Sequence, residues 1–293
     1  MRASVAICTH NRADYLAAAI RSVAGQGHEV LVVDNASTDS TAAVVASEPG
    51  VRYVHEAVLG LSHARNRALQ EASGDVVAFL DDDAVACENW LQQHLDAYAD
   101  ASVGGAGGRI DLSWPAGHRP RWMPHALDGL YAGLNLGPVD FDMNTRWPYG
   151  ANMSVRREAA LALGGFDPAL GRKGTSLISN EESKFFDQLH QTHRIRYLPT
   201  ASVEHAVVPG RDRFRYVLRR SFAAGRSQVI AGAEPRRVDV VRSLAKNGAR
   251  IAALRGGGER GPRAAVVGAA WAAEDLGRLF SVRRASAKPR GSS

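Results

Sequence analysis

Cysteine is scarce in this chain: its 293 residues include two, Cys8 and Cys87. Two cysteines do not make the disulfide framework of a small secreted domain, so a reducing compartment is expected. Long apolar runs are also missing, because the longest one, residues 264–273, is interrupted by Gly268 and is too short to span a bilayer. The first residues form an apolar strand with no signal peptide. We therefore expect a cytoplasmic protein, at most peripheral at the inner face of the membrane.

Two common phosphate-binding loops are absent as well. No G-x-G-x-x-G follows the first apolar strand, and no G-x-x-x-x-G-K-[ST] occurs. These absences argue against a dinucleotide site and against P-loop chemistry. A nucleotide bound without such a loop needs other partners, namely an aspartate that accepts from a base N–H group and a cation that neutralises the diphosphate.

Charge is unevenly distributed along the chain. Residues 1–204 carry 17 Lys and Arg against 24 Asp and Glu, a net charge of −7. Residues 205–293 carry 19 against 6, a net charge of +13. This pattern indicates either a contact with an anionic partner or Arg-rich helix faces that are simply solvated, and it leaves both open.

The first hundred residues alternate between apolar strands and amphipathic helices. The four predicted strands are residues 4–9, 29–34, 51–55 and 76–80. Repeated β-α units predict a mostly parallel sheet. Functional residues are expected where these strands end, at Thr9, Asp34 and the carboxylates that follow the fourth strand.

Those carboxylates are three in a row: Asp81, Asp82 and Asp83. Like charges this close repel one another, so solvent or a cation has to compensate them. Mn²⁺ or Mg²⁺ suits oxygen ligands and would in turn hold a phosphate. The alternative is a solvated acidic loop after a buried strand.

Eight short motifs follow one another along the chain. They are Thr9–Arg12, Val32–Thr41, Gly60–Asn66, Phe79–Asp83, Gly150–Met153, Gly164–Asp167, Asn180–Glu182 and Val203–His205. In this order and spacing they resemble the family 2 glycosyltransferases of GT-A fold, over about residues 3–228. The resemblance implies an α/β fold, a Rossmann-like nucleotide-diphospho-sugar transferase sandwich with a mostly parallel sheet, followed by a basic helical C-terminal extension.

The resemblance also implies roles for the matching residues. The nucleotide-sugar site would contain Thr9, Asn11, Arg12, Asp34, Asn35, Arg65, Asp81 and Asp82. Asp34 would accept from uracil or thymine, and Arg65 would lie near the diphosphate or the sugar. Asp83 would ligate Mn²⁺ or Mg²⁺, with Asp81 as a further ligand or a ribose contact. His205 would complete the metal site or close the nucleotide pocket by packing.

Glu181 and Glu182 would supply the catalytic base of an inverting transfer. A carboxylate there would take the proton of the acceptor hydroxyl as its oxygen attacks the anomeric carbon. The family usually has Glu-Asp at this point, with the second residue as base, whereas this chain has Glu-Glu. Glu182 is therefore the expected base and Glu181 its rival, unless Ser179 and Glu182 form a helix capping box.

Acceptor contacts are expected from Trp114, Trp122, Trp147 and Asn152. Aromatic rings commonly stack on sugars, although they also anchor long loops to a core. The glycine-rich stretch 104–108 permits unusual backbone angles or a close approach. Beyond His205, Arg211 and Arg226 would close over the diphosphate, because guanidinium groups pair well with phosphate oxygens.

The expected organisation is a catalytic domain, an extension and a tail. The ranges are 1–228, with a nucleotide-sugar half (1–103) and an acceptor and base half (104–228), then a helical basic extension (229–282) and a disordered tail (283–293). The expected partners are a nucleotide-diphosphate sugar, a UDP- or dTDP-sugar, and a hydroxyl acceptor on a glycan, a lipid-linked glycan or a small molecule, with no nucleic acid. The basic helices pack on the body, contact the membrane surface or mediate a homodimer, and the sequence leaves these three open.

Three functions are compatible with the sequence. The first is a hexosyl- or deoxyhexosyltransferase as above. The second is a haloacid-dehalogenase-type phosphotransferase, because Asp81-Asp82-Asp83-Ala84-Val85 matches that family's Asp-x-Asp-x-Thr/Val pattern with Asp81 as nucleophile. Three strands precede this motif, however, where that family usually begins with it. The third is a non-catalytic nucleotide-sugar-binding protein, which the Glu-Glu departure keeps open.

Overall fold

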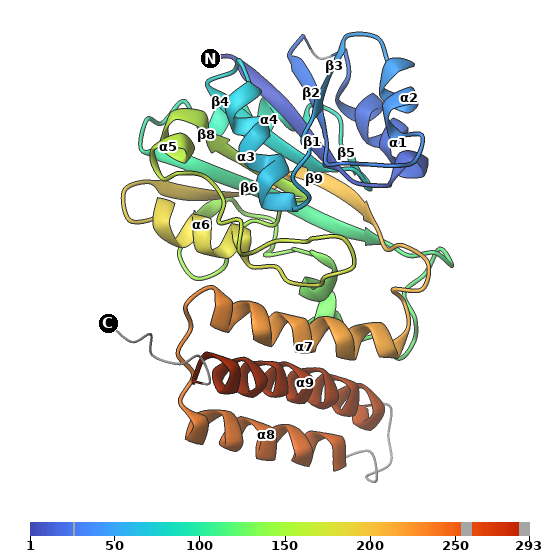
Figure 1. The fold of residues 1–293 in the computed structure, drawn as a ribbon, viewed down its shortest axis with the longest axis vertical. Helices are drawn as coiled ribbons and strands as arrows, with labels where there is room; N and C mark the ends of the chain where they lie inside the picture. The colour runs from blue at the N-terminus through green and yellow to red at the C-terminus, as the bar shows by residue number, and fades with distance from the viewer. Residues whose placement is uncertain (26, 253–259, 287–293) are drawn as a thin grey trace. The chain divides into compact units, whose positions relative to one another are not determined.

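The computed structural model describes residues 1–25, 27–252 and 260–286, which form two compact units (Figure 1). The first unit consists of Met1–Ser113, Ala132–Thr175 and Glu181–Ala206, and the second of Trp114–Tyr131, Ser176–Asn180 and Val207–Ser293. The boundary predicted after residue 228 falls inside a helix of the second unit. Residues 283–286 of the predicted tail end another helix, and the rest of that tail lies outside the described residues.

The first unit is built on one nine-stranded sheet with the order β3-β2-β1-β4-β8-β6-β9-β5, in which β7 also pairs with β9. The strands are β1 (Ala3–Thr9), β2 (Glu29–Asp34), β3 (Val51–His55), β4 (Val76–Asp81), β5 (Ala84–Ala86), β6 (Val103–Ser113), β7 (Phe141–Met143), β8 (Asn152–Arg156) and β9 (Arg194–Ala206). Strands β5, β7 and β8 are antiparallel to the other six, which are parallel to one another. The prediction of an α/β fold with a mostly parallel sheet is confirmed.

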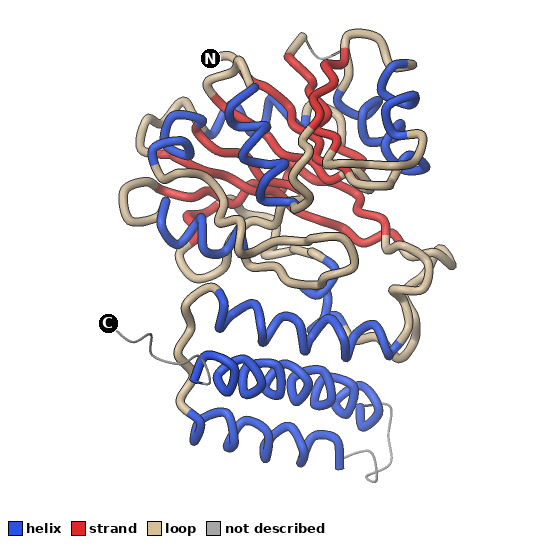
Figure 2. The backbone as a smooth tube through the Cα atoms, viewed as in Figure 1, coloured by secondary structure: helices blue, strands red, loops and turns tan. Residues whose placement is uncertain are grey.

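Helices cover this sheet (Figure 2). They are α1 (Ala13–Val23), α2 (Thr41–Ala46), α3 (Leu61–Glu71), α4 (Trp90–Ala97), α5 (Arg157–Ala162) and α6 (Glu181–Leu189). All seven residues of β1 are buried. Since successive side chains of a strand point to opposite faces, both faces of the sheet are covered there, as in other parallel α/β sheets.

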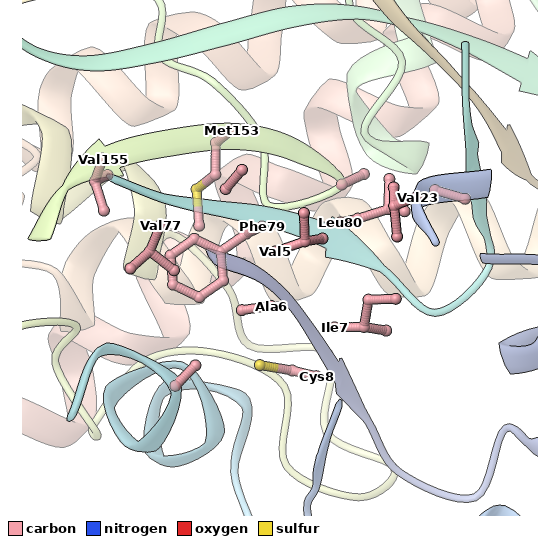
Figure 3. Close-up of a cluster of buried hydrophobic side chains, with 14 of the residues drawn as sticks. Val5, Ala6, Ile7, Cys8, Val23, Val77, Phe79, Leu80, Met153 and Val155 are labelled. Atoms are coloured by element: carbon pink, nitrogen blue, oxygen red, sulfur yellow. The ribbon is translucent and has the colours of Figure 1, made fainter. Parts of the chain in front are cut away.

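The core of the first unit lies between these helices and the central strands. Figure 3 shows Val77 and Phe79 of β4 near Val155 and Met153 of β8, and these residues are antiparallel partners in the sheet. Phe79 also meets the edge of the Phe166 ring, with centroids 5.8 Å apart. The apolar run before Asp81 is therefore a central strand, as its composition predicts.

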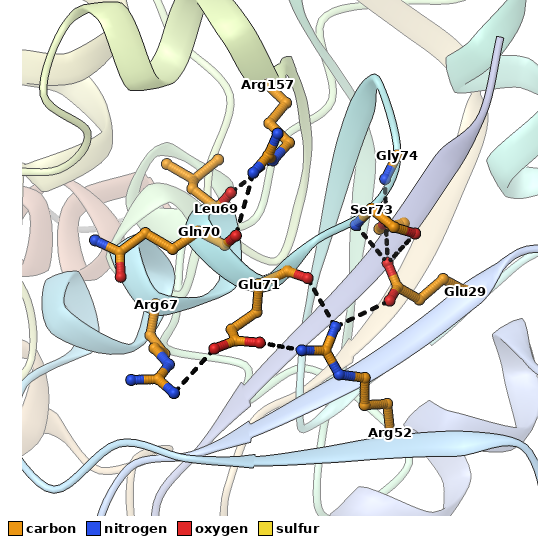
Figure 4. Close-up of polar contacts among 10 residues, drawn as sticks. Glu29, Arg52, Arg67, Leu69, Gln70, Glu71, Ser73, Gly74 and Arg157 are labelled. Atoms are coloured by element: carbon orange, nitrogen blue, oxygen red, sulfur yellow. Dashed lines mark hydrogen bonds and ion pairs between the residues drawn. The ribbon is translucent and has the colours of Figure 1, made fainter.

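Ion pairs and hydrogen bonds tie together the amino ends of the strands and the end of α3 (Figure 4). Arg52 of β3 pairs with Glu29 of β2 and with Glu71 of α3. Arg157 donates from Nε and Nη2 to the last carbonyl groups of α3, those of Leu69 and Gln70. Guanidinium groups here satisfy orphan carbonyls and suit the negative end of the helix dipole.

The second unit is helical. It contains the 3₁₀ helix η1 (His125–Tyr131) and the helices α7 (Phe214–Ile230), α8 (Arg237–Ala252) and α9 (Arg260–Ser286). In α7 and α9, Gly225 and Gly277 allow close contact, because a Cβ at Gly225 would lie 1.9 Å from the Glu274 carbonyl oxygen. Within the described residues, no helix has the length and hydropathy to cross a membrane.

Asn152 at the start of β8 is fully buried and binds four groups of the protein. Its Nδ2 donates to the carbonyl groups of Arg109 and Ala201, at 2.9 and 2.7 Å. Its Oδ1 lies 2.9 Å from both Trp90 Nε1 and His94 Nε2. Both donors and both lone pairs of the amide are thus engaged, so Asn152 joins β6, β8, β9 and α4.

We expect Asn152→Ala to lower the free energy of unfolding by about 3 kcal/mol, because it leaves buried partners without hydrogen bonds. Urea unfolding followed by circular dichroism measures this, with an unchanged m-value if the unfolded state is unaffected. The matched control is Asn144→Ala, an exposed position, where a change within about 0.5 kcal/mol is expected. Equal losses in the two variants would contradict the role assigned to Asn152.

Candidate active site

The register of the parallel strands brings their carboxyl ends to one edge of the sheet. Thr9 of β1 lies beside Asp34 of β2, and Cys8 of β1 lies beside Asp81 of β4. The end of β2 also lies beside the end of β3, through Asp34 and His55. The residues predicted at the strand ends are therefore neighbours, as expected for an α/β sheet.

Asp81, Asp83 and His205 form a cluster at this edge. One ligand atom from each lies within 4.8 Å of the others, two carboxylate oxygens and one imidazole nitrogen. The pairing of β5 with β9 positions His205, because Ala84 is its partner in the sheet. His205 Nε2 lies 2.8 Å from Asp83 Oδ1 and 4.0 Å from Asp81 Oδ2. Hard oxygen donors with one imidazole fit Mn²⁺ or Mg²⁺.

Positive side chains compensate part of the negative charge of this cluster. Arg12 Nη1 donates to Asp83 Oδ2 at 2.7 Å. Burial and the charge of Asp83 raise the pKa of Asp82 to about 7. Burial is also the main cause that raises the pKa of Asp81, against the lowering influence of Arg65 and His205. The three carboxylates therefore lack enough positive charge from the protein alone, which is the condition expected of a cation site.

A second cluster surrounds Arg65 of α3, whose side chain is 2% exposed. Its Nη1 lies 3.0 Å from Glu181 Oε1 and 3.1 Å from Glu182 Oε1, and its Nη2 lies 3.8 Å from Asp81 Oδ1. The guanidinium also lies over the Phe166 ring, 5.5 Å from its centroid. Arg65 thus connects the start of α6 to the end of β4.

Gly150 closes this cluster from the loop before β8. Its N–H donates to Glu182 Oε1 at 3.2 Å. A Cβ at this position would lie 1.7 Å from Arg65 Nη2, so a residue with a side chain would displace the guanidinium from its contacts with the glutamates. The capping box considered for Ser179 and Glu182 is not formed, because α6 begins at Glu181 and the Glu182 carboxylate binds Arg65 and Gly150 instead.

The two glutamates of α6 have opposite pKa shifts. Burial and the neighbouring charge of Glu182 raise the pKa of Glu181 to about 8, although Arg65 opposes this. Burial works in the same direction on Glu182, but Arg65 and backbone N–H groups outweigh it and hold the pKa of Glu182 below its usual value. The pair therefore favours a proton on Glu181 and the ionised form of Glu182.

Asn11, Asp34 and Asn35 organise the loops after β1 and β2. Asn11 Oδ1 accepts from Thr38 N at 2.7 Å, and Asn35 accepts from Gly60 N and donates to Val58 O. Asp34 Oδ1 accepts from Ser37 N at 2.9 Å. These loops are thereby held in place around the end of β2.

Tyr53 is a neighbour of this group that the sequence did not reveal. Its hydroxyl donates to Asp34 Oδ2 at 2.7 Å, and burial together with that carboxylate raises the pKa of Tyr53 to about 12. Tyr53 lies on β3, opposite Val32 of β2. The period of the strand predicts which face Tyr53 occupies but not which residue of β2 it meets.

The remaining predicted site residues lie elsewhere. Trp147 is half-buried, and its Nε1 donates to Asp187 Oδ1 at 2.6 Å, while Asn152 is the buried residue described above. Four others belong to the second unit: Trp114, Trp122, Arg211 and Arg226. There Trp114 packs on the edge of Tyr131, with centroids 5.3 Å apart. The structure thus groups the nucleotide, metal and base candidates in one unit. The acceptor contact predicted for Asn152 does not agree with its full burial and its four bonds within the protein, and the assignments of the other five residues stay predictions.

Comparison with known proteins identifies the class. A model of the family described as Glycosyl transferase family 2 matches residues 4–160, and the chain belongs to this family. A glucosyl-dolichyl phosphate glucuronosyltransferase of Haloferax volcanii is 28% identical over 78% of this chain and 77% of its own length. The succinoglycan biosynthesis protein ExoM of Rhizobium meliloti is 29% identical over 76% of this chain and 72% of its own.

Solved structures agree on the fold. The mannosyltransferase PcManGT from Pyrobaculum calidifontis, in complex with GDP-Man and Mn²⁺, superposes with a TM-score of 0.60 at 20% identity, over 99% of this chain and 88% of that chain. The likeness confirms the predicted GT-A fold. The protein is an enzyme, a glycosyltransferase, and the phosphotransferase and non-catalytic hypotheses are set aside.

We expect Glu181→Gln and Glu182→Gln to change the pH dependence of stability in opposite directions. The folded protein keeps the Glu181 proton up to a pKa of about 8, whereas the unfolded chain loses it near 4.5. Glu181 therefore makes the wild type less stable as pH rises between these values, by at most about 1.4 kcal/mol per pH unit. Glu181→Gln removes this loss, so the stability of the variant relative to the wild type increases as pH rises from 5 to 8.

Glu182 acts in the other direction, because its lowered pKa means that the folded state favours the ionised form. Its contribution is present above the unfolded pKa and is lost as pH falls. Glu182→Gln is therefore expected to be less stable than the wild type at pH 8, with the difference shrinking towards low pH. Urea midpoints of the three proteins between pH 4 and 9 test this, and shifts of the same sign in both variants would refute the assignment.

Proposed function

We propose that this enzyme transfers a sugar with inversion from a nucleotide-diphosphate donor to a hydroxyl acceptor, with Mn²⁺ or Mg²⁺ as cofactor. The observation that carries the proposal is the pair of neighbouring clusters: Asp81, Asp83 and His205 for a metal, and Glu182 paired with Arg65 for the base. Asp81 belongs to both, since it lies 4.0 Å from His205 Nε2 and 3.8 Å from Arg65 Nη2. At one strand end, the metal cluster would therefore bind the leaving diphosphate, and Glu182 would accept the proton of the attacking hydroxyl.

Asp81, Asp83 and His205 would hold the cation. When bound, it would supply positive charge to the departing diphosphate. The Pyrobaculum mannosyltransferase was solved with GDP-Man and Mn²⁺. A crystal structure of GalNAc-T7 with UDP, GalNAc and Mn²⁺ is also similar, with a TM-score of 0.54 at 17% identity, over 71% of this chain and 44% of that chain. These complexes support a metal-dependent reaction here.

Glu182 is the proposed base. Arg65 and Gly150 both bind its Oε1, so we assign the proton transfer to Oε2. The acceptor hydroxyl would give its proton to this atom as its oxygen bonds to the anomeric carbon, and the bond from that carbon to the diphosphate oxygen would break. Glu181 keeps its own proton at neutral pH, so it limits the negative charge beside the base without competing for the acceptor proton.

For the donor we propose a UDP- or dTDP-sugar. Uracil and thymine each present an imide N–H, and Asp34 at the end of β2 is a carboxylate suited to accept from it. Tyr53 and the Ser37 amide fix the orientation of this carboxylate. For the acceptor we propose a glycan, lipid-linked glycan or small-molecule hydroxyl. The Haloferax relative, named for a glucosyl-dolichyl phosphate substrate, supports a lipid-linked one.

The donor site is tested by calorimetric titration of the protein with UDP, dTDP, GDP and CDP, each with Mn²⁺ and with EDTA. We expect binding of UDP or dTDP that requires Mn²⁺ and that weakens at least tenfold in Asp83→Asn. The matched control is Asp140→Asn, an exposed carboxylate outside the cluster, which should bind as the wild type does. Preference for GDP would replace the proposed donor, and binding that is equal in EDTA would refute the metal role.

The base is tested by nucleotide-sugar turnover, measured as release of the diphosphate that binds. Glu182→Gln should lower kcat by about 10²–10⁴-fold, the usual contribution of a general base, with unchanged diphosphate affinity. Glu181→Gln should retain kcat within about tenfold, since Gln resembles the protonated carboxyl in shape and charge. If instead Glu181→Gln is inactive and Glu182→Gln is active, the base is Glu181.

A further inference from the structure

Helix α8 of the second unit packs along α9 through a face that combines apolar residues with one buried amide. Asn247 is 2% exposed, and its Nδ2 donates to Asp275 Oδ2 of α9 at 3.1 Å. Asp275 is buried as well, and Arg278 Nη1 donates to its other oxygen at 2.5 Å. On the same face of α8, Val240 is buried and Leu244 is half-buried.

The opposite face of α8 is apolar and exposed. Val238 and Val241 are 53% and 58% exposed, and Ala245 and Ala249 are exposed as well. The spacing of three and four residues places these four side chains in one stripe along the helix. Val240, Leu244 and Asn247 lie on the side of α8 that is buried or half-buried, so these exposed residues form a second apolar stripe that the protein does not cover.

Basic side chains border this stripe. Arg242 and Lys246 each follow a residue of the stripe and lie about 100° further around the helix, while Arg237 precedes Val238 and lies on the other border. Asp239 pairs with Arg242 at 3.9 Å, but both side chains are well exposed and such pairs are weak. The positive charge agrees with the net +13 of residues 205–293.

Charge complementarity selects the occupant of this face. In a two-fold pairing of α8 with a second copy, each basic border would face another basic border, which is repulsive. An anionic lipid surface accepts the apolar stripe at its acyl boundary and the Arg and Lys side chains among its head groups. The face also lacks the aromatic residues that stack on nucleic-acid bases.

We propose that the outer face of α8 docks on the surface of an anionic lipid bilayer and holds the enzyme there. This concerns the location of the protein rather than its reaction, so it stands independently of the proposed donor, metal and base. The helix lies in the plane of the interface with Val238 and Val241 inserted, and α9 carries the remainder of the unit on its other side.

Flotation of the full chain with vesicles tests the proposal. The vesicles contain phosphatidylglycerol with phosphatidylcholine, or phosphatidylcholine alone. We expect the wild type to float with the first and not the second, and to be released as salt rises. Val238→Glu with Val241→Glu should lower the apparent partition coefficient at least tenfold. Arg242→Glu with Lys246→Glu should do the same, since one basic residue near such a surface contributes about fivefold.

The matched control is Val58→Glu with Val139→Glu, two valines of the first unit that are 51% and 67% exposed. It introduces the same charges and should bind vesicles as the wild type does. Circular dichroism and the thermal midpoint show whether each variant is folded. Absence of wild-type flotation, or an equal loss in the control, would overturn the proposal. A dimer seen by light scattering that is lost with the α8 valines, without vesicle binding, would assign the face to a second copy instead.

Discussion

The candidate active site depends on one buried cation, the guanidinium of Arg65. A charge removed from water costs several kcal/mol unless it is paired and hydrogen-bonded. Here the pairing groups are Glu181, Glu182 and Asp81, at 3.0, 3.1 and 3.8 Å, and the two glutamates are more than a hundred residues from Arg65 in the chain. Burying Arg65 therefore requires α3, α6 and the end of β4 to come together. The same contact that offsets the charge also aligns the proposed base.

Charge balance likewise governs the metal cluster at the end of β4. Arg12 and His205 both contact Asp83, whereas burial and the charge of Asp83 leave Asp82 with a pKa of about 7. Burial and like charge thus favour protonation of these aspartates where no cation compensates them. Because carboxylates bind metals in their deprotonated form, a divalent ion would displace those protons. Affinity for the ion would then depend on pH. Asp81 lies between His205 and Arg65, so its charge also interacts with that of Glu182.

Local sequence patterns predicted the first four strands of the first unit, but they did not predict contacts between residues far apart in the chain. The predicted strands at residues 4–9, 29–34, 51–55 and 76–80 differ from β1 to β4 by one residue at most, because an apolar run shows directly that a strand is buried. The family motifs then pointed to the clusters now seen at the strand ends. Ser62, for example, lies inside α3, and its hydroxyl donates to Leu170 O. That partner is 108 residues away, and nothing near Ser62 indicates it.

Helix α8 shows why an apolar pattern does not by itself identify the packed face. Along the sequence of α8, Val238, Val241, Leu244 and Ile251 are apolar and follow an approximately helical spacing. In the structure the side of α8 that packs on α9 contains Val240, Leu244 and Asn247, whose Nδ2 donates to Asp275 Oδ2, while Val238 and Val241 are exposed. A buried amide facing a carboxylate is costly unless the two meet, so this pair specifies the helix contact more strictly than interchangeable apolar side chains do.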